Sequence, residues 1–98
     1  MIIDCHGHYT TAPLALDDWR NRQVAGIKDP ALMPMPSDLK ISDDALRESI
    51  ETNQLALMRK RGIDLTVFSP RASFMAHHIG DFQISSTWAA ICNELCFR

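Results

Sequence analysis

Two histidines stand two positions apart near the start of the chain, in the segment IIDCHGH at residues 2–8. Because alternate residues of a β-strand face the same way, His6 and His8 are predicted to point to one side, with Asp4 behind them. Two imidazoles at the carboxyl end of a strand can bind one divalent metal ion, and zinc accepts such nitrogen ligands readily. Asp4 could instead accept a hydrogen bond from one imidazole and orient it. The alternative is a histidine pair without a ligand, which the apolar strand and the preceding acid disfavour.

A carboxylate on a later helix is a second candidate ligand. Glu48 lies within the helix predicted for residues 42–62, between Leu46 and Ile50. Its carboxylate could reach a metal ion if this helix covers the strand ends. The alternative is a solvated surface glutamate, which the sequence alone favours for a charged residue on a helix.

A third group of polar residues follows the second predicted strand, in the segment SPRASFMAHHIGDF at 69–82. Ligands of parallel α/β folds bind beyond the carboxyl ends of the strands, so this segment is expected at the same mouth as the histidine pair. Arg71 could hold a carboxylate by paired hydrogen bonds, with Ser73 beside it. His77 or His78 could transfer protons near neutral pH. The alternative is a loop arginine and a surface histidine pair.

These residues must be positioned by two strands that alternate with helices. The strands are predicted over 2–5 and 63–69, the helices over 10–29, 42–62 and 85–98, an irregular connection over 30–40 and a loop over 70–83. This order implies a parallel sheet with right-handed crossovers. The connection between the strands is long for a βα unit, which indicates a helical insertion at about 10–61. Two strands do not make a stable sheet alone. The chain ends inside an amphipathic helix, which favours the opening segment of a larger α/β protein.

Capping residues and apolar stripes define the helices. Thr11, Ser42 and Ser86 are predicted N-caps, and Gly62 is predicted to end the second helix. The expected apolar stripes are Leu16, Trp19, Gln23 and Ile27 on the first helix, Leu46, Ile50 and Leu57 on the second, and Trp88, Ile91, Cys92 and Leu95 on the third.

Composition sets the broad class of the protein. The chain has 98 residues, 46% of them hydrophobic, which indicates one packed globular domain rather than a disordered chain. A formal charge of -2 argues against nucleic-acid binding, which calls for a basic face. No run reaches the roughly 18 apolar residues of a membrane span. The three cysteines include no CxxC pair, which predicts reduced thiols in a cytoplasmic protein.

Three segments together carry a resemblance to a known family: DCHGHY at 4–9, the stretch at 39–82, and STWAAICNEL at 86–95. The whole chain resembles the N-terminal part of the 4-oxalomesaconate hydratases, which are members of the amidohydrolase superfamily. The D-x-H-x-H element is typical of the superfamily. The segment at 69–82 is more specific and favours the hydratases over the related decarboxylases.

The resemblance implies an α/β fold, the N-terminal portion of a (β/α)8 TIM-type barrel. Residues 1–98 would supply about two strands and three helices of an incomplete barrel domain. It also implies one divalent metal ion, zinc, with His6 and His8 as the first two ligands and Glu48 as a carboxylate ligand. A further histidine ligand and the general base would lie in later strands.

The implied activity is the addition of water to 4-oxalomesaconate, giving 4-carboxy-4-hydroxy-2-oxoadipate in the breakdown of protocatechuate, gallate and lignin-derived acids. Arg71, Ser73 and His77 match the loop that meets the substrate's carboxylates, with His77 as the catalytic residue. The partner is then a small anionic keto acid, neither nucleic acid nor membrane, and the parent is expected to be a homo-oligomer. The alternatives are a metal-dependent decarboxylase of an unsaturated dicarboxylic acid, or a non-catalytic truncated chain, because a barrel needs eight strands and roughly 250 residues.

Overall fold

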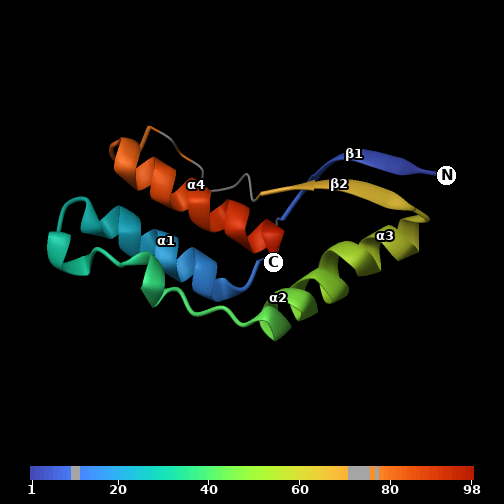
Figure 1. Ribbon diagram of the computed structural model, residues 1–98, viewed down its shortest axis with the longest axis horizontal. Helices are drawn as coiled ribbons and strands as arrows, with labels where there is room; N and C mark the ends of the chain where they lie inside the picture. The colour runs from blue at the N-terminus through green and yellow to red at the C-terminus, as the bar shows by residue number, and fades with distance from the viewer. Residues whose placement is uncertain (10–11, 71–75, 77) are drawn as a thin grey trace.

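The computed structural model describes residues 1–9, 12–70, 76 and 78–98. In chain order the elements are β1 (Ile3–His8), α1 (Leu14–Gly26), the 3₁₀ turns η1 (Pro30–Leu32) and η2 (Pro36–Asp38), α2 (Asp43–Ser49), the π-helical η3 (Ile50–Leu55), α3 (Ala56–Arg61), β2 (Leu65–Ser69) and α4 (Phe82–Phe97). Figure 1 shows α1 and α4 side by side at one end of the molecule and the two strands together at the other. The long helix formed by α2, η3 and α3 leads back to the start of β2.

The two strands pair in parallel, which confirms the order expected from the sequence. Ile3 lies opposite Leu65, and His8 lies opposite Ser69. β1 extends three residues beyond the predicted segment, so both histidines belong to the strand itself. The register shifts between Asp4 and Gly7, which makes a β-bulge in β1 and locally re-aims its side chains.

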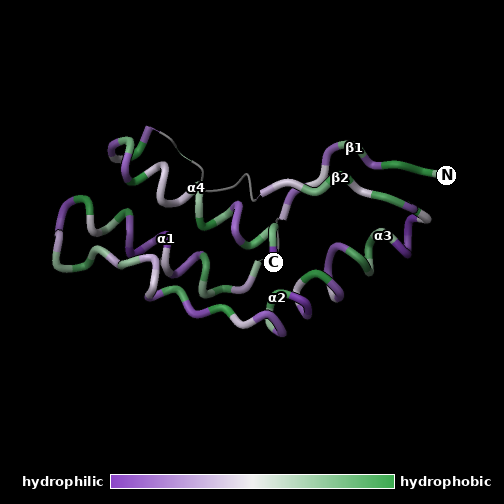
Figure 2. The backbone as a smooth tube through the Cα atoms, viewed as in Figure 1, coloured by the Kyte–Doolittle hydropathy of each residue, from purple (hydrophilic) through white to green (hydrophobic). Residues whose placement is uncertain are grey.

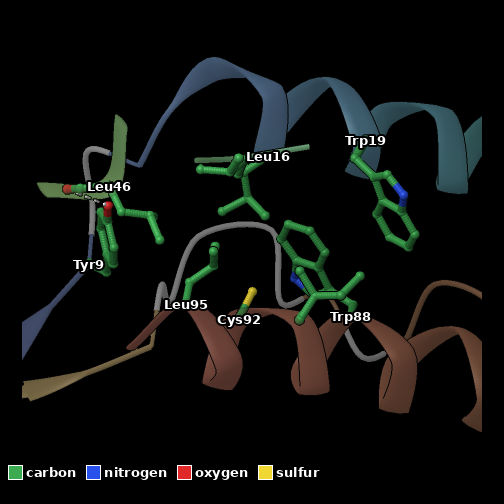
Figure 3. Close-up of a cluster of buried hydrophobic side chains, with 9 residues drawn as sticks. Tyr9, Leu16, Trp19, Leu46, Trp88, Cys92 and Leu95 are labelled. Carbon is green, nitrogen blue, oxygen red and sulfur yellow. Dashed lines mark hydrogen bonds between the residues drawn. The ribbon is translucent and has the colours of Figure 1, made fainter. Parts of the chain in front are cut away.

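The hydrophobic core lies between α1 and α4 and is closed at one end by Tyr9 and Leu46 (Figure 3). Trp88 of α4 is completely buried, and its ring stacks on that of Trp19 with centroids 6.2 Å apart and planes inclined by 10°. The expected stripe on the last helix is confirmed, because Trp88, Ile91, Cys92 and Leu95 are all buried. The core therefore joins the first and last helices, which are far apart in the sequence.

A polar pair inside this core also ties α1 to α4. Arg20 and Gln23 are each 1% exposed, and Arg20 Nη1 donates to Gln23 Oε1 at 2.6 Å. Gln23 Nε2 donates to the carbonyl oxygen of Ile84 in the first turn of α4, at 3.1 Å. The Arg20 guanidinium lies 5.0 Å from the centre of the Trp88 ring, a cation–π contact. Gln23 is the polar member of the predicted stripe, and this network satisfies it.

Helix boundaries follow the predicted caps for one helix and differ for another. Ser42 Oγ accepts from the Ala45 N–H, and Gly62 ends the helix with φ +68°. The Ser86 prediction is wrong, because α4 begins earlier and Asp81 caps it by accepting from the Ile84 N–H. Asp81 is itself a favoured N-cap type, and Ser86 lies inside the helix. α1 is shorter than predicted, begins after Pro13 and ends before Ile27; Thr11 lies outside the described residues.

Apolar side chains remain exposed on the sheet and on the adjoining helix. Ile3, Leu65 and Val67 are each more than half exposed, and the N-terminal end of β1 is strongly apolar in Figure 2. Leu57 is 45% exposed, so this part of the predicted stripe is not buried. In the described residues the sheet has two strands, each with one free edge. None of the described helices is both long and apolar enough for a membrane span.

Candidate metal centre

The imidazoles of His6 and His8 converge at the carboxyl end of β1. Their Nε2 atoms are 2.7 Å apart, and the ring centroids are 4.7 Å apart with planes at 63°. The expectation that both histidines face one side is therefore confirmed, despite the bulge. The two nitrogens are hydrogen-bonded to each other, and imidazoles this close on one face of a strand are placed to bind one zinc-like ion in place of that bond.

The ring of His8 is held by residues at the end of β2. Its Nδ1 lies 2.9 Å from the carbonyl oxygen of Pro70 and 2.9 Å from Ser69 Oγ. Ser69 Oγ also donates to the carbonyl oxygen of Gly7 at 2.6 Å, so it can only accept from His8. Because a carbonyl cannot donate either, the proton of the neutral ring belongs on Nδ1. That tautomer leaves Nε2 unprotonated, so it accepts the hydrogen bond from His6 Nε2 here and offers a lone pair that a metal ion could use.

The bulge places Asp4 and Gly7 in specific roles around the pair. Asp4 Oδ1 accepts from the backbone N–H of His6 at 3.1 Å, so it stabilises the bulged backbone and does not orient an imidazole. A Cβ atom on Gly7 would lie 2.4 Å from Thr66 Cγ2, which real Cβ atoms do not tolerate. The close approach of the strands beside the histidines thus requires glycine.

The structure does not bring Glu48 together with the histidine pair. Glu48 is exposed, and its carbonyl oxygen accepts from Thr52 Oγ1 at 2.8 Å within the helix. Across the described residues, no three His, Cys, Asp or Glu side chains are grouped closely enough to hold a metal ion. The role of Glu48 as a ligand stays a prediction.

Part of the predicted substrate loop, residues 71–75 and 77, lies outside the residues that the structure describes. Arg71, Ser73 and His77 lie outside the described residues, and their roles stay predictions. The residue just before them, Pro70, is described and contacts His8 through its carbonyl oxygen. Of the predicted loop, Pro70 therefore lies beside the histidine pair.

Contacts from the long helix to His8 and Tyr9 were not anticipated from the sequence. Gln54 Nε2 donates to the carbonyl oxygen of His8 at 3.0 Å. The Tyr9 hydroxyl is hydrogen-bonded to Ser49 Oγ and lies 3.5 Å from the carbonyl oxygen of Leu46. Burial raises the pKa of Tyr9, against the opposing effect of the Ser49 hydrogen bond. The sequence offers one sign of these contacts, which is that the polar residues Ser49 and Gln54 interrupt the amphipathic pattern of the long helix.

An open groove adjoins the histidine pair. It has a volume of about 940 Å³ and lies between the strands and the helical segment formed by η3 and α3. His6 and His8 line it, and much of its wall is apolar, with Ile50, Met58 and Leu65 among its residues. The site therefore combines two metal-ligand candidates with a cavity wide enough for a small molecule.

Two parallel strands, three long helices and an imidazole pair at the carboxyl end of β1 define an α/β segment that matches part of a TIM-barrel amidohydrolase. The chain is homologous to the N-terminal part of 4-oxalomesaconate hydratase, also described as 2-keto-4-carboxy-3-hexenedioate hydratase. This homology confirms the resemblance inferred from the sequence motifs.

Two relatives show how much of such a hydratase this chain covers. A 2-keto-4-carboxy-3-hexenedioate hydratase from Sphingobium sp. (strain NBRC 103272 / SYK-6) is 55% identical over 98 residues, which is 100% of this chain and 28% of that protein. The crystal structure of 4-oxalomesaconate hydratase from Rhodopseudomonas palustris matches with a TM-score of 0.90 and 72% identity, over 99% of this chain and 28% of that one. No protein-family model matches the chain. The chain thus spans about 28% of the length of these hydratases.

Proposed function

We propose that this chain supplies the N-terminal part of a metal-dependent hydratase. The whole protein would add water to 4-oxalomesaconate, a small anionic keto acid, to give 4-carboxy-4-hydroxy-2-oxoadipate in the breakdown of protocatechuate and gallate. The observation that carries the proposal is the convergence of His6 and His8 Nε2, 2.7 Å apart, in a chain 72% identical to a solved hydratase.

The residues at the end of β1 suit a divalent ion such as zinc. His6 and His8 would hold it, with Glu48 as a proposed third ligand. When bound, such an ion stabilises negative charge on substrate oxygens. This chain presents His8 in one tautomer, because the Pro70 carbonyl and Ser69 Oγ both accept a hydrogen bond from its Nδ1–H.

The segment after β2 would bind the substrate. Its first residue, Pro70, contacts the ring of His8, which supports a position for the following residues close to the proposed metal ion. The Arg71 guanidinium would pair with a substrate carboxylate through two parallel hydrogen bonds, and Ser73 would donate another. His77 would hold or move a proton at the substrate, a task suited to an imidazole near neutral pH.

A hybrid protein tests the proposal. This chain would replace the matching 28% of the R. palustris hydratase, where the 72% identity favours correct assembly. We expect the hybrid to bind zinc and to hydrate 4-oxalomesaconate, as followed by loss of the substrate's absorbance. His6→Ala should remove bound metal and activity together, because one of two converging nitrogens is lost.

The matched control is Cys5→Ala, which changes the exposed neighbouring residue on the same strand and should leave both properties intact. Retention of full metal content and full rate in the His6→Ala hybrid would overturn the site assignment. Release of carbon dioxide in place of hydration would overturn the reaction and favour the decarboxylase alternative.

A further inference from the structure

The long helix beneath the strands changes its winding at one place. α2 and α3 are α-helical, and η3 between them is π-helical over Ile50–Leu55. In an α-helix, residues five positions apart lie about 140° apart around the axis. A π-helix bonds residue i to residue i+5 and so brings residues five apart to nearly the same side. Ser49 and Gln54 are five positions apart; Ser49 is the last residue of α2, and Gln54 lies within η3.

These two residues contact Tyr9 and His8, at and just after the end of β1. Ser49 bonds with the Tyr9 hydroxyl, and Gln54 Nε2 donates to the carbonyl oxygen of His8 at 3.0 Å. The Gly7 carbonyl and the Tyr9 N–H both bond to Ser69 of β2. Because successive peptide groups of a strand point to opposite edges, the His8 carbonyl faces away from β2. Gln54 thus satisfies one carbonyl, that of His8, on the edge of β1 that β2 leaves open.

The result is that His8 is held from two sides. Pro70 and Ser69 at the end of β2 fix its ring through Nδ1, each at 2.9 Å. Gln54 fixes its backbone through the carbonyl oxygen. The next residue, Tyr9, is 2% exposed and holds its place in the core, which anchors the strand end further. The π-helical segment η3 thus places Gln54 against the end of β1.

We propose that Gln54, presented by the π-helical segment, is a positioning residue for the metal-ligating imidazole of His8. The inference rests on the proposed metal centre and adds a residue that acts through the backbone of His8. Loss of the Gln54 hydrogen bond would free the His8 backbone to move, and Nε2 would move with it. Since π-helical turns occur often at functional sites, this placement also gives a reason for the irregular winding.

The test measures zinc affinity in the hybrid hydratase by competition with a chromophoric chelator. Gln54→Met keeps the length of the side chain and removes the donor, and should weaken zinc binding roughly 10-fold, the lower end for hydrogen-bond partners that support metal ligands. Gln54→Lys restores a donor of similar reach and should recover most of the affinity. Asn53→Ala is the control, because Asn53 Nδ2 donates to Ser49 O within the helix, at 2.8 Å.

A second variant guards against misfolding of the first. Gln54→Asn keeps the amide and shortens the reach by one methylene, so it should lose affinity as Gln54→Met does. Amide hydrogen exchange at Tyr9 in the metal-free hybrid should also speed up in both variants and not in Asn53→Ala. Zinc affinity equal to that of Asn53→Ala in both Gln54 variants would overturn the inference and leave the proposed function standing. Failure of the unsubstituted hybrid to bind zinc would instead overturn both.

Discussion

A methyl group added at Gly7 should damage the proposed metal centre without changing a proposed ligand. Gly7 lies between His6 and His8, and a Cβ atom there would lie 2.4 Å from Thr66 Cγ2 and 3.2 Å from the carbonyl oxygen of Val67. Thr66 is β-branched and therefore stiff at χ1, so it has little freedom to rotate away. Gly7→Ala must then push the two strands apart.

The size of the effect follows from these distances. Ordinary contact with a Cβ atom begins at 3.4 Å, so the strands must yield by about 1 Å. Insertion of a methyl group into a tightly packed position costs typically about 1–3 kcal/mol. The same movement is a large fraction of the 2.7 Å that separates the two Nε2 atoms, so zinc binding should weaken together with stability.

Thermal unfolding and zinc competition on the hybrid hydratase measure both effects. Thr66→Ser removes Cγ2, so Gly7→Ala combined with Thr66→Ser should regain most of the lost stability and zinc affinity. Gly62→Ala is the control: it strains a backbone with φ +68° but meets no atom within 4 Å, so it should lower stability by about 1 kcal/mol and leave zinc affinity unchanged. A Gly7→Ala hybrid that matches the parent in both measurements would refute the reasoning.

Two further predictions concern the core. Trp88→Ala should lower the free energy of unfolding by about 3–5 kcal/mol, because the ring is completely buried and stacked on Trp19; a loss below about 1 kcal/mol would contradict this packing. Burial raises the pKa of Tyr9 from its ordinary value of 10.0, so the folded state favours the protonated phenol. The contribution of this preference to the free energy of unfolding is complete below pH 10.0 and is lost as the pH rises through the raised pKa. Denaturation curves measured below and above pH 10.0 should therefore show a fall in stability that Tyr9→Phe reduces, and an identical fall in Tyr9→Phe would exclude Tyr9 as its source.

Local signals in the sequence were sufficient for several features. Ser42 and Gly62 mark the ends of the long helix because N-capping by a hydroxyl and an αL glycine each depend on a few neighbouring residues. The period-two spacing of His6 and His8 was enough to place both rings on one side of β1. The alternation of strands and helices was enough to predict a parallel pair.

Only the tertiary structure decided which residues support the histidine pair. Gln54 and His8 are 46 positions apart, and their contact depends on where the long helix docks and on its π-helical turn. The bulge in β1 depends on its register with β2 and redirects Asp4 to the backbone of His6. Such contacts arise from packing between distant segments, and local residue patterns carry no information about that packing. The sequence alone determined the candidate ligands; the fold determined what holds them in place.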